Sequence, residues 1–184
     1  MLISRVTRRV VPVAGSLLAL LATAACNLTG SHPAGESSAQ PAPAAAPVAL
    51  PPQPQPTANG PCPYLQTEFV AEANGQHVGK VRVSADQPHP ACFFYRPDGG
   101  LQLTARVYVG DPKVAKGLVD QAAPVGTSNP ASLDGGWQGG SQPTDSGAVY
   151  AVAKGGEAIV VTTNQKQTIK ARRVTEQVIS ALAL

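Results

Sequence analysis

The composition of residues 27–60 is the feature that most limits which part of this 184-residue chain can fold. The segment consists mainly of Pro, Ala, Ser and Gln, and it has eight prolines, at positions 33, 41, 43, 47, 51, 52, 54 and 56. Such a composition cannot bury enough apolar surface to offset the entropy lost on ordering. We therefore expect a disordered Pro/Ala-rich tether, either bare or carrying O-linked sugars, and a hydrophobic core only within residues 61–184.

The segment 1–25 has the layout of an export signal. Three arginines precede an apolar stretch that is too short to span a bilayer comfortably, and small residues follow it: Arg5, Arg8, Arg9, then Thr23, Ala24 and Ala25. Cys26 comes next, as in a lipobox, where the thiol is diacylated and the chain is cut before it. We expect a lipoprotein anchored on the outer face of the cell membrane. A plain secretory signal cleaved near Ala25 is the alternative, and the paired arginines leave twin-arginine export open.

The charge of the precursor does not describe the mature protein. The chain has 14 Lys and Arg side chains against 11 Asp and Glu side chains, and three of the arginines lie in the signal. The remainder is balanced, so the sequence shows no basic surface that would survive processing. Nucleic acid is therefore excluded as a partner.

The two other cysteines predict a disulfide bond. If Cys26 is lipidated, only Cys62 and Cys92 remain. An even pair of cysteines in an exported protein is typical of a structural bridge, which here closes a loop of about 30 residues.

Helix and strand signals alternate through residues 61–184. We expect helices from Cys62 to Asn74, over 112–122 and from Gln167 onward, strands over 78–83, 91–96, 101–109, 149–153 and 158–163, and a Gly/Ser/Pro-rich loop over 123–146. Tight turns between short strands favour antiparallel pairing. The prediction is an α+β fold: one domain in which an antiparallel β-sheet packs with helices.

No known catalytic motif is present in the sequence, so we expect no catalytic residues, no cofactor and no enzyme activity. Asp86 and His89 are close enough to begin a metal or acid-base site, but a third ligand is not apparent. We interpret His89 as a solvated loop residue and predict no metal site.

Trp137 lies between two Gly-Gly pairs and is the most promising binding residue. A tryptophan in flexible surroundings offers a large amphipathic contact surface. The alternative, which we favour, is that Trp137 belongs to the core, because the chain has few aromatic residues and the core needs them.

Three stretches carry a family resemblance: Pro61–Leu65, Asn74–Val81 and Asp86–Arg96, the last reading DQPHPACFFYR. Together with the tether after a lipobox, they resemble small mycobacterial lipoproteins that are classified as an actinobacterial domain of unknown function. The resemblance covers nearly all of residues 61–184, and the motifs around the two cysteines are its specific part. It implies a cell-envelope lipoprotein with a disulfide bond and transfers no catalytic residues.

Two functions remain open. The first is a non-catalytic interaction module, held on a long tether so that it meets a protein or polymer of the envelope. The second is a carrier of a lipid or another hydrophobic ligand, which needs an apolar cavity between sheet and helices. We favour the first, because 124 residues leave little volume for an acyl chain once a core is filled.

Overall fold

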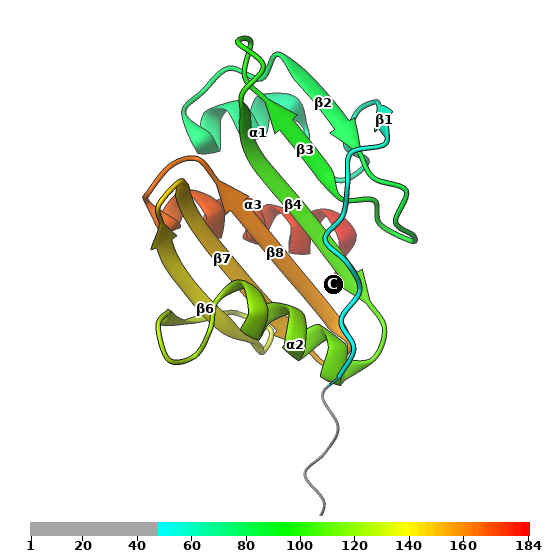
Figure 1. Cartoon of the computed structure of the whole chain (residues 1–184), viewed down its shortest axis with the longest axis vertical. Helices are drawn as coiled ribbons and strands as arrows, with labels where there is room; N and C mark the ends of the chain where they lie inside the picture. Colours follow the sequence, from blue (N-terminus) through cyan, green and yellow to red (C-terminus); the bar gives the residue numbers. More distant parts are fainter. Residues whose placement is uncertain (1–47) are drawn as a thin grey trace, which may run out of the picture. The chain divides into compact units, whose positions relative to one another are not determined.

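The computed structural model describes residues 48–184, which form one domain with an eight-stranded antiparallel sheet and three helices (Figure 1). The elements are β1 Ala58–Asn59, α1 Thr67–Asn74, β2 Lys80–Val83, β3 Cys92–Tyr95, β4 Leu101–Val109, α2 Pro112–Ala122, β5 Asn129–Leu133, β6 Trp137–Thr144, β7 Gly147–Lys154, β8 Glu157–Thr163 and α3 Thr168–Leu182. The predicted α+β class is confirmed. The predicted signal, Cys26 and most of the tether lie outside the described residues.

The strand order is β1-β2-β3-β4-β8-β7-β6-β5. The last four strands of the chain form a meander, and β8 returns to pair with β4 in the middle of the sheet. The register between β3 and β4 shifts, so that Phe94 faces Leu103 and Tyr95 faces Leu101. Gln102 is therefore an extra residue in β4, which is the arrangement of a β-bulge.

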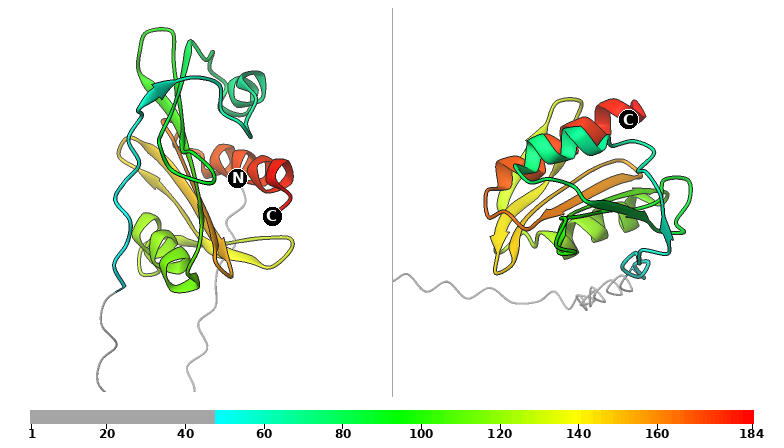
Figure 2. Two further views of the ribbon diagram at one scale, coloured as in Figure 1. Left: turned by 90° about the vertical axis from the view of Figure 1, so that its right-hand side faces the viewer. Right: turned by 90° about the horizontal axis from the view of Figure 1, so that it is seen from above.

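Helices cover both faces of the sheet. Helices α1 and α3 lie on one face and α2 on the other (Figure 2). Alternation along the strands supplies both layers: Ile159 and Val161 of β8 belong to the larger core under α1 and α3, whereas Ala158 packs toward α2. The core under α2 is built from small side chains, so this helix lies close to the sheet.

Helix α2 begins as its sequence predicts. The Asp111 carboxylate accepts hydrogen bonds from the backbone N–H groups of Lys113 at 2.7 Å and Val114 at 3.3 Å. Pro112 occupies the first turn, where its missing N–H group costs nothing.

Helix α1 starts later than predicted, at Thr67 instead of Cys62. Residues 62–65 form an irregular turn instead, because three of their side chains are held in the interior of the domain. Cys62 is bonded to Cys92, and Tyr64 and Leu65 are buried. The predicted end is correct. Gly75 adopts a φ of 71° and closes the helix, a conformation that glycine takes without strain.

The predicted loop over 123–146 is wrong, because this stretch contains β5 and β6. Glycine and proline suggested a loop, but both fit these positions in the sheet. Pro130 lies in β5, an edge strand, where a missing N–H group is tolerated. Gly139 of β6 lies so close to the backbone of Ala151 that a side chain there would collide with it.

Residues 48–60, which the sequence places in the tether, run along the domain, and we call them the strap. The Thr57 N–H group donates to the carbonyl of Val83 at 2.9 Å, and Ala58–Asn59 pairs with β2. Arg106 holds the strap further upstream by donating to the carbonyl of Pro52 at 3.0 Å. The folded part of the chain therefore begins before Pro61. Backbone hydrogen bonds fix the strap, and its composition does not reveal them.

Candidate apolar groove beside α2

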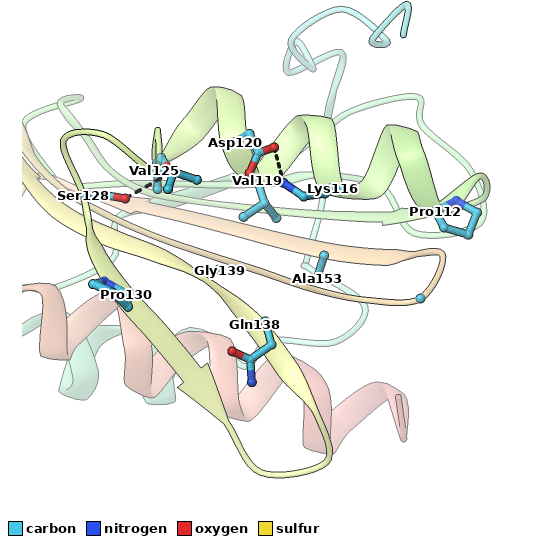
Figure 3. A pocket seen from close by; sticks show the side chains of 12 residues that line it. Pro112, Lys116, Val119, Asp120, Val125, Ser128, Pro130, Gln138, Gly139 and Ala153 are labelled. Carbon is cyan, nitrogen blue, oxygen red and sulfur yellow. Dashed lines mark hydrogen bonds and ion pairs between the residues drawn. The ribbon is translucent and has the colours of Figure 1, made fainter. Parts of the chain in front are cut away.

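An open groove of about 470 Å³ runs beside α2, on the face of the sheet opposite α1 and α3 (Figure 3). One wall is α2 and the loop after it, and the floor is formed by β6 and β7. The lining residues are Pro112, Lys116, Val119, Asp120, Ala123, Val125, Ser128, Pro130, Gln138, Gly139, Ala153 and Gly155. Their exposed surface is mainly apolar.

Small residues create the groove. Ala153 has only a methyl group on this floor, and Gly140 of β6 allows close contact with Ala123 and Ser128. Helix α2 turns Leu118 and Val119 toward the sheet, and both are almost completely buried. No large side chain from β6 or β7 rises to fill the space next to the helix, so the hollow stays open.

The rim of the groove combines one ion pair with one exposed apolar side chain. Lys116 Nζ lies 2.5 Å from a carboxylate oxygen of Asp120, which is on the next turn of α2. Val125, in the loop after the helix, is 80% exposed and is the most exposed large hydrophobic side chain of the described residues. The hydroxyl group of Ser128 donates to the backbone carbonyls of Ala123 at 3.2 Å and Pro124 at 2.9 Å, and the lining as a whole is suited to binding an apolar group.

Trp137, a predicted binding residue, is 1% exposed and belongs to the larger core. Lys154 Nζ lies 4.9 Å from the centre of the ring, a distance that permits a cation–π contact. The interpretation of Trp137 as an exposed contact surface is wrong, because the flanking glycines are part of a strand and its turn and not of a flexible loop. The alternative, a core tryptophan, is confirmed.

Asp86 and His89 each contact a different neighbour. The Asp86 carboxylate accepts a hydrogen bond of 2.6 Å from the hydroxyl group of Ser84, and the His89 ring meets the ring of Tyr64 edge to face at 6.3 Å. In the part of the chain that the structure describes, no three His, Cys, Asp or Glu side chains gather as metal ligands would.

The predicted pair Cys62–Cys92 is bonded, with Cα atoms 5.6 Å apart. The bond joins the irregular segment before α1 to β3. Nearby, burial raises the pKa of Tyr64, and the negative charge of Asp86 adds to the effect. The bridge and this buried phenol together hold the N-terminal part of the domain on the sheet.

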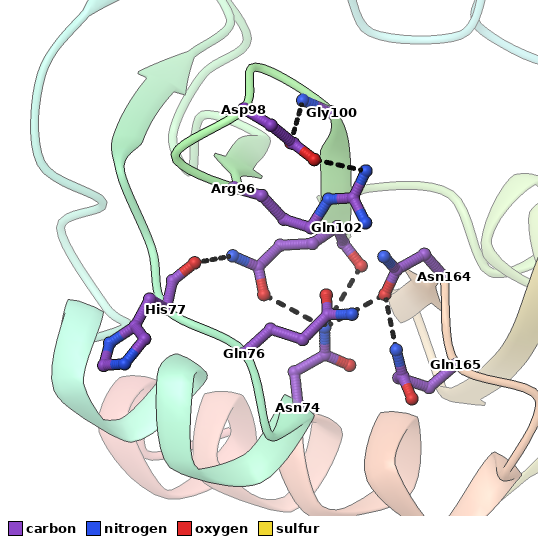
Figure 4. Close-up of polar contacts among 9 residues, drawn as sticks. All are labelled: Asn74, Gln76, His77, Arg96, Asp98, Gly100, Gln102, Asn164 and Gln165. Carbon is purple, nitrogen blue, oxygen red and sulfur yellow. Dashed lines mark hydrogen bonds and ion pairs between the residues drawn. The ribbon is translucent and has the colours of Figure 1, made fainter.

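A polar cluster lies at the N-terminal end of β4, next to the β-bulge at Gln102, and connects α1, β4 and the loop before α3 (Figure 4). Gln102 donates to the carbonyl of His77 at 2.8 Å and accepts from Asn74 at 3.1 Å, and Asn74 also donates to Asn164 at 3.2 Å. Asn74 and Gln102 are fully buried. Because these amides satisfy one another, the cluster fixes the end of α1 to β4 and to the loop before α3.

Sequence reasoning missed the groove. Its lining comes from α2, the following loop and three strands, and two of these strands, β5 and β6, lie in the stretch that the sequence predicts to be a loop. The one signal was Val125, a large apolar residue in a segment otherwise rich in Gly, Ser and Pro.

Among residues 48–184, no helix is long and apolar enough to cross a membrane.

Comparison with known proteins identifies the family without assigning an activity. None of the curated proteins compared with the chain matches it. The sequence model of one family matches residues 45–184, a range that includes the strap and all three helices. The chain therefore belongs to the family described as a domain of unknown function, DUF2020.

Proposed function

We propose that this protein is a cell-envelope lipoprotein, held on the outer face of the membrane through Cys26, and that its domain is a non-catalytic binding module. The partner is an apolar segment of an envelope protein, and it binds in the groove beside α2. The groove is the observation that carries this proposal, because it is an apolar hollow that the side chains of residues 48–184 leave open.

The shape of the groove favours an extended partner. It follows α2 from Pro112 to Ala123 and opens toward β5, which is an edge strand of the sheet. A segment lying there has apolar contacts along its length and meets the Lys116–Asp120 pair at the rim. Val125, almost fully exposed, would lose most of its water contact on binding, which favours association.

The N-terminal sequence supports the proposed location. A lipobox-like segment ends at Cys26, and a Pro-rich segment separates it from the strap. Pro-rich chains behave as semi-rigid spacers. A module on such a spacer reaches partners that lie away from the lipid surface.

A lipid carrier is the second candidate, and the groove volume favours it, since small-molecule sites usually measure about 300–1,000 Å³. Two features rank it lower. The groove of about 470 Å³ is open to solvent, and the core beneath the sheet is filled by large buried side chains such as Trp137 and Phe94. An acyl chain would therefore stay partly in water.

Site-specific photocrosslinking in intact cells tests the module. A photoreactive amino acid at position 125 should give a discrete crosslinked protein, whereas the same amino acid at position 169 should not, because Ile169 is 62% exposed on α3, outside the groove lining. Ala153→Phe fills the floor of the groove and should remove the product. Ala181→Phe, at an exposed site on α3, is the matched control and should leave it unchanged.

Equal crosslinking from both positions, or a product that Ala153→Phe does not affect, would overturn the proposal. Native mass spectrometry of residues 27–184, made in an actinobacterial host, distinguishes the lipid carrier from the binding module. An added mass that organic solvent releases, and that Ala153→Phe abolishes, would establish the carrier in place of the module.

A further inference from the structure

Arg106 is a buried cation that forms no ion pair with a carboxylate of residues 48–184. It lies near the middle of β4, and its exposed fraction is 9%. Its hydrogen bond goes to the backbone carbonyl of Pro52 in the strap. None of the ion pairs among the described residues includes Arg106.

A guanidinium group that loses water without gaining an anion is costly, and it does not escape the cost by losing its proton. Burial lowers the pKa of Arg106, and the charge of Asp86 opposes this shift without forming an ion pair. One neutral carbonyl supplies little compensation, and the planar group has five N–H donors. Among the described residues, the hydrogen bond of Arg106 is the one to Pro52, and its other nitrogens keep some contact with solvent, where an anion can reach them.

The guanidinium group borders a separate pocket of about 170 Å³, which lies between the strap, the sheet and α2 and is partly open to solvent. The lining residues are Gln53, Pro54, Phe93, Thr104, Arg106, Leu118, Gln121, Ala122, Val160 and Thr162. Phe93, Leu118 and Val160 form an apolar wall. Two amides and two hydroxyl groups supply further hydrogen-bonding groups, and Arg106 is the one charged residue of the lining.

We propose that this cavity is a binding site for a carboxylate ligand, with Arg106 as the residue that pairs with the carboxylate. Guanidinium and carboxylate groups match geometrically, and two parallel hydrogen bonds give such a pair both strength and direction. A phosphate group, with close to two negative charges, would be left partly uncompensated by one cation. The apolar wall accommodates the carbon chain of the ligand.

The cavity is smaller than a typical site for a drug-sized molecule, so either a short organic acid fits or only the carboxyl end of a longer chain enters. The chemistry at Arg106 is the same in both cases. This site is separate from the groove beside α2, since the two linings share no residue. Ala153→Phe in the groove should leave carboxylate binding intact, so that failure of either proposal does not decide the other.

The test is a titration of residues 27–184, which keep the strap, followed through the side-chain Nε–Hε signals of the arginines by NMR. Sodium propionate, at constant ionic strength against sodium chloride, should shift the Arg106 signal saturably. A second titration compares N-acetyl-Ala-Ala, which has a free carboxylate, with its C-terminal amide, which has none. Dipeptide binding at least tenfold tighter than propionate would identify a chain end as the ligand, and comparable binding would identify a small acid.

Variants distinguish the site from a general charge effect. Because the Arg106 variants lack the Arg106 signal, all variants are titrated through the backbone amide signals of Thr104 and Thr162, which line the pocket. Arg106→Gln should weaken propionate binding at least tenfold, Arg106→Lys less, and Arg82→Gln, another arginine of the sheet, should have no effect. Ala122→Leu narrows the cavity while keeping the charge, so it tests the site even if Arg106→Gln does not fold. Absence of a saturable shift at Arg106 with either carboxylate, or equal weakening by Arg82→Gln, would overturn the proposal.

Discussion

The hydroxyl group of Tyr64 lies 3.2 Å from the backbone carbonyl of Ala105 in β4 and 2.8 Å from that of Pro90. Tyr64 precedes α1, and Ala105 belongs to the middle of the sheet, 41 residues further along the chain. The phenol thus connects the irregular N-terminal segment, the loop before β3 and β4. The Cys62–Cys92 bond, two residues away from Tyr64, makes a second connection in the same region.

Tyr64→Phe should lower the free energy of unfolding by about 1–2 kcal/mol, because two carbonyl groups lose a buried donor while the packing of the ring remains. Denaturant titration measures the change. Tyr95→Phe is the matched control, since Tyr95 is only partly buried and its hydroxyl group forms no hydrogen bond with residues 48–184. An equal loss in both variants would contradict a specific role for the Tyr64 hydroxyl group.

The same tyrosine predicts loss of stability at alkaline pH. Burial raises the pKa of Tyr64 above its ordinary value of about 10, so above pH 10 the unfolded chain releases a proton that the folded chain keeps. The unfolded state then binds fewer protons, and the free energy of unfolding falls with a slope of up to about 1.4 kcal/mol per pH unit. Burial also raises the pKa of Tyr150, which adds to this trend.

Denaturant titrations between pH 9 and pH 11.5 measure the slope. Tyr64→Phe should flatten the curve above pH 10 without changing its shape at lower pH. A curve for Tyr64→Phe that runs parallel to that of the wild type would show that Tyr64 is not responsible for the loss.

Removing the disulfide bond by a Cys62→Ala, Cys92→Ala double substitution should cost about 3–4 kcal/mol, the loop entropy of a bridge across a separation of 30 residues. Chemical denaturation of the oxidised and double-alanine proteins gives the difference. In the oxidised wild type, a thiol reagent should label neither cysteine until a reductant is added. Labelling of both thiols without reductant would contradict the bond.

Strands β4, β7 and β8 were predictable because their sequence patterns are typical of buried strands. In β4, apolar side chains recur at every second position, whereas β7 and β8 contain short continuous apolar runs on either side of a Gly-Gly turn. The structure places β4 and β8 in the centre of the sheet, with β7 next to β8. The cap at Asp111 and the stop at Gly75 were equally readable, since each depends on the local chemistry of one or two residues.

The strap and β6 were missed for a common reason. Both depend on backbone contacts with segments far away in the sequence: Thr57 with Val83 in the strap, and Gly139 with Ala151 in β6. Their composition, rich in Gly, Pro, Gln and Ser, does not record these contacts. The groove, which requires β5 and β6 to exist, was therefore beyond what the sequence alone could predict.

Gly139→Ala should be strongly destabilising, by about 3 kcal/mol or more, because the added methyl group would collide with the backbone of Ala151 in the neighbouring strand. Gly126→Ala is the matched control. Its methyl group would meet no atom within 4 Å, and we expect a change within about 0.5 kcal/mol. Thermal unfolding of both variants compares them, and similar melting temperatures would contradict the close approach of β6 and β7.

The cysteine count leads to the prediction for the membrane anchor. The chain has three cysteines, and the Cys62–Cys92 bond uses two, so Cys26 is the remaining candidate for lipidation. Cys26→Ala should release the protein from the membrane fraction without changing the thermal stability of the domain, because the bond is untouched. Ser31→Ala, nearby in the predicted tether, is the control and should stay with the membrane. Unchanged membrane retention of Cys26→Ala would rule out the lipid anchor, and release of the wild-type protein would favour a plain secretory signal.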